Sequence, residues 1–204
     1  MTRRGLFIAL EGIDGAGKST LAKALARRWR ARGLSVAMRR EPNDRRLGSK
    51  AQAASARAPW SGAMLFTLDR LLERSNLRRA LERHDVVLTD RSFYSTLAYQ
   101  GSALPRSARR KLVLVQHGVT EIPDRVVLLE LTPVDALSRV AGRSRRRSPL
   151  ERLAILRRVA RAYRRMARDP AWIVVDARLP VEELAERVDR RLRAGLARRR
   201  RARG

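Results

Sequence analysis

The chain has 204 residues, which suits a single domain with a full hydrophobic core. It has no cysteine and only two histidines, which excludes disulfides and clustered Cys/His metal sites. No apolar run approaches the roughly 20 residues that a membrane helix needs. We therefore expect a cytoplasmic protein. The net charge is +27, but its arginines are spread over most predicted helices, which favours a general preference for arginine over a nucleic-acid interface.

The first predicted elements flank a phosphate-binding motif. Residues 6–10 form an apolar run that predicts a buried strand, and Leu21, Leu25 and Trp29 then recur at helical spacing. Between them lies a match to G-x-x-x-x-G-K-[ST], the P-loop, and the predicted ATP-binding residues are Gly12, Ile13, Asp14, Gly15, Ala16, Gly17, Lys18, Ser19 and Thr20. In a P-loop, backbone N–H groups and a helix N-terminus bind phosphate, the lysine reaches the β- and γ-phosphates, and the serine hydroxyl ligates Mg²⁺. The sequence therefore predicts binding of a nucleoside triphosphate with Mg²⁺.

The rest of the chain alternates between strand and helix patterns. Further strands are predicted at residues 34–38, 85–89, 125–131 and 172–176, and helices at residues 61–83, 105–118, 150–168 and 181–196, with Pro133 opening another helix. Apolar strands separated by helices predict an α/β fold, a five-stranded parallel sheet in a three-layer α/β/α P-loop NTPase arrangement. Ligands are then expected at the carboxyl ends of the strands.

The predicted domain covers residues 1–197. Within it, residues 142–149 lack a core pattern and are expected to form a mobile lid loop between two helices. Residues 198–204 form a basic tail that is expected to be disordered, and which could add a weak, salt-dependent affinity for polyanions.

Four further motifs lie near strand ends. They are Arg-Glu-Pro at residues 40–42, Phe-x-x-Asp-Arg at residues 66–70, Asp-Arg at residues 90–91, and Ser-Thr-x-Ala-Tyr-Gln-Gly at residues 95–101. With Asp14 in the P-loop and Pro-Asp at residues 123–124, their order makes the chain resemble the thymidylate kinase family. The P-loop is shared by many NTPases, whereas the motifs at residues 66–70 and 95–101 are far more specific to this family.

The resemblance implies roles in binding dTMP and Mg²⁺. Phe66 would stack on the pyrimidine, although a core aromatic is the commoner fate of such a residue. Arg70 would hydrogen-bond the thymine carbonyl near the acceptor phosphate, and Arg91 would hold that phosphate; a solvated arginine is the alternative for Arg70. Asp90 would approach the Mg²⁺ shell with Ser19, and could also cap a helix.

Other residues take roles around the sugar and the base in this resemblance. Asp14 would contact the sugar 3′-hydroxyl, and the ring of Tyr99 would crowd the 2′ position and select deoxyribose. The remaining predicted substrate-binding residues are Arg40, Glu41, Ser95, Thr96 and Gln100. Of these, Thr96 and Gln100 would face the base, and Arg40 and Glu41 would organise the site.

The chain departs from many bacterial relatives at two places. Asn43 and Asp44 follow the Arg-Glu-Pro motif where those relatives have Gly-Gly-Thr, and the loop lacks an acidic residue until Glu151. One subclass of the family carries a catalytic arginine in the P-loop at the place held here by Gly15, so the charge is expected from the loop instead. Its candidates are Arg143, Arg145, Arg146 and Arg147, of which Arg147 aligns best.

The predicted catalytic residues are Lys18, Arg91, Arg143 and Arg147. The implied reaction transfers the γ-phosphoryl group of ATP to dTMP with Mg²⁺, in a homodimeric enzyme. Two alternatives stay open: a kinase of another nucleoside monophosphate, and a P-loop nucleic-acid-associated protein.

Overall fold

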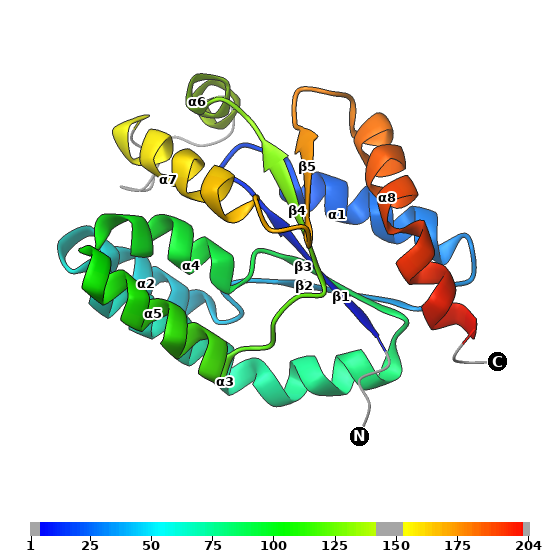
Figure 1. Ribbon diagram of the computed structural model, residues 1–204, viewed down its shortest axis with the longest axis horizontal. Helices are drawn as coiled ribbons and strands as arrows, with labels where there is room; N and C mark the ends of the chain where they lie inside the picture. The colour runs from blue at the N-terminus through cyan, green and yellow to red at the C-terminus, as the bar shows by residue number, and fades with distance from the viewer. Residues whose placement is uncertain (1–4, 142–152, 202–204) are drawn as a thin grey trace.

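A five-stranded parallel sheet forms the centre of the computed structural model, which describes residues 5–141 and 153–201 (Figure 1). The strands lie in the order β2-β3-β1-β4-β5, and every pair is parallel. They are β1 (Leu6–Glu11), β2 (Val36–Arg40), β3 (Val86–Asp90), β4 (Arg125–Glu130) and β5 (Trp172–Asp176). The predicted α/β fold is confirmed, because both faces of this sheet are covered by helices.

Helices cover the sheet in two layers. In Figure 1, α1 and α8 lie on one face, while α3, α4, α5 and α7 lie on the other. The helices are α1 (Lys18–Arg30), α2 (Arg45–Arg57), α3 (Pro59–Arg83), α4 (Phe93–Tyr99), α5 (Arg106–Val119), α6 (Pro133–Ala141), α7 (Leu153–Met166) and α8 (Val181–Arg201), with a short 3₁₀ turn η1 (Gly101–Ala103) after α4. Within the first layer, the buried side chain of Asp189 on α8 accepts hydrogen bonds from Trp29 of α1 at 2.9 Å and from Arg32 at 2.8 Å, which connects the two helices.

The strand register brings the chemistry-bearing segments to one edge of the sheet. Asp90 at the end of β3 lies level with Leu10 of β1 and with Arg40 of β2. The P-loop follows β1, and the Arg-Glu-Pro motif begins at the last residue of β2. The carboxyl ends of three adjacent strands therefore meet where a ligand of a parallel sheet is expected.

Two helices were not predicted. In α2, Asp44 is the N-cap and accepts a hydrogen bond from the backbone N–H of Leu47 at 2.7 Å. The buried positions of α2 are small or polar, Gly48, Ala51 and Ser55, so no apolar stripe marks it. In α4, seven residues are too few to show a helical period, although its N-cap, Ser92, is a residue type that favours this position.

Some predictions concern residues that the structure describes only in part or not at all. The lid loop at residues 142–149 lies outside the described residues, as do residues 150–152 of the predicted helix 150–168. Helix α8 includes residues 198–201 of the predicted basic tail, and residues 202–204 lie outside the described part. None of the described helices is long and apolar enough to cross a membrane.

Candidate active site

The P-loop wraps the N-terminus of α1 as the motif predicts. Gly12 and Gly17 have φ angles of 145° and 92°, a backbone region that side chains disfavour. A Cβ at Gly12 would lie 2.7 Å from the carbonyl oxygen of Leu129, so only glycine fits between the loop and β4. The N–H groups of Asp14 and Ala16 are already used, by the Tyr99 hydroxyl at 3.2 Å and the Ile13 carbonyl at 3.2 Å. The positive end of α1 is directed toward the loop, where an anion would bind.

A cavity of about 340 Å³ joins the P-loop to the other motifs. Its lining includes most of the predicted site residues: Asp14, Gly15, Gly17, Lys18, Ser19, Thr20, Arg40, Glu41, Phe66, Arg70, Asp90, Arg91, Ser95, Thr96, Tyr99 and Gln100. The predicted residues Gly12, Ile13 and Ala16 do not line it, because the side chains of Ile13 and Ala16 are buried in the core. Arg143 and Arg147 lie outside the described residues.

Lys18 is buried and points back toward its own loop. Its Nζ donates to the carbonyl oxygens of Gly12 at 2.9 Å and Ile13 at 3.0 Å. Burial, together with the positive charge of Arg91, lowers the pKa of Lys18 to about 8. The ammonium group is thus held in place beside the cavity, and an anion bound there would favour its charged form.

Asp90 and Ser19 form the predicted metal position. The Ser19 hydroxyl donates to Oδ2 of Asp90, while Oδ1 of the same carboxyl is buried and has no hydrogen-bond partner among the described residues. Asp90 does not cap α4, which was the alternative role considered for it, because Ser92 is the N-cap of that helix. A carboxylate oxygen and a hydroxyl are ligands that Mg²⁺ accepts, so the unpartnered oxygen fits a metal shell at this place.

Arg91 occupies a strained backbone position. Its φ of 78° is the sole positive φ among the non-glycine residues that the structure describes, and such strain gathers at functional sites. The backbone is held on both sides: its N–H donates to Leu10 O at 3.0 Å, and its carbonyl accepts from the Thr89 hydroxyl at 2.7 Å. This strain directs the guanidinium group into the cavity from the end of β3.

The guanidinium of Arg91 contacts three predicted site residues. It forms an ion pair with Asp14, donates to the hydroxyl of Ser95 at 3.0 Å, and lies 5.4 Å from the ring centroid of Tyr99. Burial raises the pKa of Asp14, but the charges of Arg91 and Lys18 and a hydrogen bond from Tyr99 outweigh it, so that this pKa is lowered overall. Burial raises the pKa of Tyr99, and its hydroxyl accepts from the backbone N–H of Asp14 at 3.2 Å.

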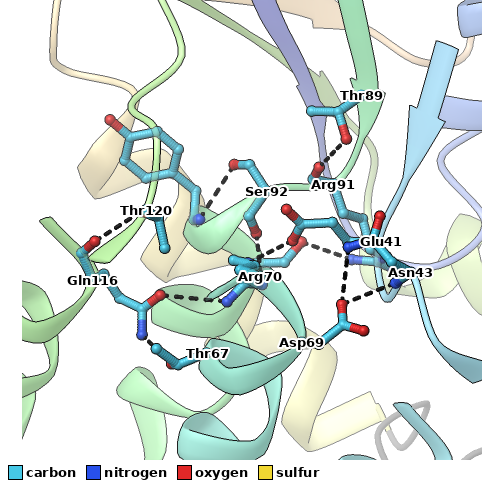
Figure 2. Close-up of polar contacts among 12 residues, drawn as sticks. Glu41, Asn43, Thr67, Asp69, Arg70, Thr89, Arg91, Ser92, Gln116 and Thr120 are labelled. Carbon is cyan, nitrogen blue, oxygen red and sulfur yellow. Dashed lines mark hydrogen bonds and ion pairs between the residues drawn. The ribbon is translucent and has the colours of Figure 1, made fainter. Parts of the chain in front are cut away.

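Arg70 reaches the same cavity from α3, held by groups from three other segments (Figure 2). Its Nε donates to Glu41 at 2.6 Å, Nη1 to Gln116 at 3.3 Å, and Nη2 to the carbonyl oxygen of Ser92 at 3.2 Å. These bonds use three of its five N–H donors, so two remain for a ligand. Arg70 is 8% exposed, which rules out the alternative of a solvated arginine.

The other predicted substrate residues line the cavity near Arg70. Phe66 is half-buried and belongs to the lining, so it is not the fully buried core aromatic that was its alternative. Thr96 is 1% exposed, and its hydroxyl has no hydrogen-bond partner among the described residues. A buried, unpartnered hydroxyl in a cavity wall is a ready partner for a ligand.

Three buried polar residues support the site, and none of them was assigned a role from the sequence, although Asp69 belongs to the motif at residues 66–70. Glu11 is fully buried at the end of β1; one of its oxygens accepts from Ser92, and the other accepts from Ser95 at 2.7 Å and from Tyr163 at 2.8 Å. Asp69 accepts from the backbone N–H groups of residues 43 and 44, and Gln116 joins α5 to Arg70 (Figure 2). A charged residue that ends an apolar strand just before the P-loop was the available signal for Glu11.

Comparisons with known proteins agree with this arrangement. The family model described as thymidylate kinase matches residues 10–188. A probable thymidylate kinase of Archaeoglobus fulgidus is 36% identical over 186 residues, covering 90% of this chain and 92% of the relative. Thymidylate kinases of Leifsonia xyli and Thermomicrobium roseum are 39% and 41% identical, covering 93% and 89% of this chain and 95% and 91% of the relatives.

Proposed function

The chain belongs to the thymidylate kinase family, and we propose that it transfers the γ-phosphoryl group of ATP to dTMP, giving dTDP. The observation that carries this proposal is the shared cavity. The P-loop residues Lys18 and Ser19 line one part of it, and the family-specific residues Arg70 and Tyr99 line another. A site that must join two phosphate-bearing substrates needs both sets in one space.

At the ATP end, the P-loop backbone and Lys18 would hold the β- and γ-phosphates. Ser19 and Asp90, whose Oδ1 is without a partner among the described residues, would hold Mg²⁺. The metal would supply positive charge that neutralises the phosphates. The ammonium of Lys18 is held by two carbonyl oxygens and would lie beside the transferred group. Its charge would stabilise the negative charge of the transition state.

At the acceptor end, Arg91 would hold the dTMP phosphate. Its guanidinium fork matches phosphate geometry, and its strained backbone fixes the direction from which it approaches. The buried ring of Tyr99 lies beside Arg91 and would restrict the sugar, and the carboxylate of Asp14, which pairs with Arg91, would contact the sugar hydroxyl. Since the acceptor is already a phosphate oxyanion, positioning and charge neutralisation are enough and no strong base is required.

A panel of acceptors tests this proposal. ADP release would be measured with MgATP and dTMP, dUMP, dCMP, AMP or the ribose analogue of dTMP, with Lys18→Ala as the control for contaminating kinases. We expect the highest kcat/KM for dTMP, and a loss of about 10²–10³-fold in Lys18→Ala, as for other electrostatic contacts to the reacting group. Equal kcat/KM for dTMP and AMP would reject the proposed dTMP kinase activity. In a separate binding assay, DNA binding that persists in high salt would favour the alternative of a nucleic-acid-associated protein.

We also propose that the enzyme is a homodimer and acts in the cytoplasm. The dimer is supported by three exposed leucines on one face of α3, Leu68, Leu71 and Leu72, which are 43%, 47% and 68% exposed. The structure thus leaves a large part of these apolar side chains uncovered by their own chain.

A further inference from the structure

The amide of Gln100 is held in one orientation by Ser55 of α2. Ser55 is buried, and its hydroxyl donates its single proton to the carbonyl oxygen of Ala51 at 2.7 Å. It can therefore only accept from Gln100, whose Nε2 lies 2.9 Å away. The amide nitrogen of Gln100 is thereby directed at α2, and its oxygen, which has no partner among the described residues, is left for the cavity that Gln100 lines.

Close packing of two helices keeps Ser55 in this position. Gly62 of α3 faces it, and a Cβ at Gly62 would overlap with the Ser55 hydroxyl and lie 2.8 Å from the carbonyl oxygen of Ala51. The serine is thus confined between its own helix turn and the backbone of α3, and its hydroxyl cannot turn to donate to Gln100 without losing its bond to Ala51.

The cavity consequently offers a donor and an acceptor together. Arg70 has two N–H donors left, and Gln100 presents an acceptor oxygen. Thymine and uracil present the complementary pair on adjacent atoms, the O4 acceptor and the N3–H donor. Cytosine presents the reverse pair, an amino donor and the N3 acceptor, and would leave the buried groups of the protein unpaired.

We propose that Ser55 is a positioning residue for base selection: by holding the amide of Gln100, it makes the pocket accept an N3–H donor and reject cytosine-type bases. This rests on the proposed acceptor being a pyrimidine deoxynucleotide bound in this cavity. Ser55 itself contacts no substrate, and its effect passes through Gln100 alone.

The test compares dTMP with 5-methyl-dCMP, which differs from it only at the N3 and C4 positions of the ring. In Ser55→Ala the amide of Gln100 is free to turn, and we expect the ratio of kcat/KM for dTMP over 5-methyl-dCMP to fall about tenfold or more, as for the loss of one buried hydrogen bond. The change should lie in KM for the acceptor, with kcat for dTMP and KM for ATP within threefold of the wild type. Ser49→Ala, at an exposed serine of the same helix, is the matched control and should leave the ratio unchanged.

Two results would overturn the assignment of Ser55: an unchanged ratio in Ser55→Ala, or a parallel fall for both nucleotides, which is what a merely structural role predicts. If the proposed dTMP kinase activity itself is wrong, the wild type will phosphorylate neither nucleotide, which separates that failure from a wrong assignment of Ser55. In that case calorimetric binding of the same two nucleotides to the wild type and to Ser55→Ala decides whether Ser55 sets the preference.

Discussion

At the scale of single residues, the lowered pKa of Lys18 makes nucleotide binding sensitive to alkaline pH. Burial and the charge of Arg91 bring this pKa to about 8 in the free protein. Bound phosphates favour the charged ammonium and raise the pKa in the complex, so above pH 8 binding must take up a proton. We therefore expect kcat/KM for ATP to be level below pH 8 and to fall above it, by up to about tenfold per pH unit.

The measurement is a pH profile of kcat/KM for ATP between pH 6.5 and 9.5 at saturating acceptor. Lys18→Arg is the control, because a guanidinium stays charged over this range and its profile should lack the fall, whatever its absolute rate. A wild-type profile that stays level up to pH 9.5 would show that the Lys18 ammonium is not the group that titrates.

Residues that belong to a local sequence motif could be predicted from the sequence. Residues whose partners are distant in sequence could not be predicted. Lys18, Arg70 and Arg91 each belong to a motif, and each lines the cavity. Glu11 and Gln116 are fully buried and bond to segments distant in sequence, Glu11 to Tyr163 and Gln116 to Arg70. The neighbouring sequence does not indicate which distant residue will contact such a side chain. Its role becomes visible only when the helices are packed on the sheet.

At the scale of elements, α2 shows why strands were predicted more completely than helices. The strands β1, β3 and β4 are mostly apolar and mostly buried, whereas β2 ends in two arginines and is partly exposed. All five strands were predicted, with β2 lying two residues beyond its predicted range of 34–38. Helix α2 instead packs on α3 through small residues, and the close approach depends on Gly62, where a Cβ would meet backbone atoms of α2 at 2.8 Å. This kind of contact leaves no hydrophobic period in the sequence.

Gly62→Ala tests that close approach. The added methyl should force α2 away from α3, costing about 1–3 kcal/mol of unfolding free energy, as overpacking does elsewhere. Because α2 carries Ser55, KM for dTMP should rise as well. The control is Gly118→Ala on α5, where a Cβ would meet nothing within 4 Å and should stabilise the helix by about 0.5–1 kcal/mol. Urea unfolding of both variants gives the free energies, and equal stability in the two would contradict this account of the α2–α3 contact.

Residues 142–149, which the sequence predicts to be a lid loop, contain the remaining candidates for a catalytic charge. Gly15 lines the cavity but has no side chain to donate, so we propose that Arg143 and Arg147, with their neighbours Arg145 and Arg146, supply the guanidinium at the γ-phosphate; this stays a prediction, since the loop lies outside the described residues. Replacing all four with glutamine should lower kcat by about 10³-fold or more, the effect of a catalytic arginine in related chemistry. If kcat stays within a few-fold of the wild type, another arginine must serve the reaction.

At the scale of the whole molecule, the active site and the proposed dimer face are separate. The residues that line the cavity do not include Leu68, Leu71 or Leu72, and these leucines point away from the core on α3. The net charge of +27 would drive two copies apart, and the apolar face must outweigh that repulsion. Since salt screens charge over about 8 Å at physiological ionic strength, the dimer should be favoured as salt rises.

The double variant Leu71→Glu/Leu72→Glu tests the dimer. Two carboxylates at the centre of the face would have to be buried without partners, so we expect the wild type to sediment as a dimer and the variant as a monomer at the same concentration. Val174→Glu, at an exposed apolar residue of β5, is the matched control and should remain dimeric. Because none of these leucines lines the cavity, the monomeric variant should retain kcat for dTMP within a few-fold. A wild type that sediments as a monomer from low to high salt would exclude this face as an interface, and a monomeric variant without activity would show that the second copy contributes to the site.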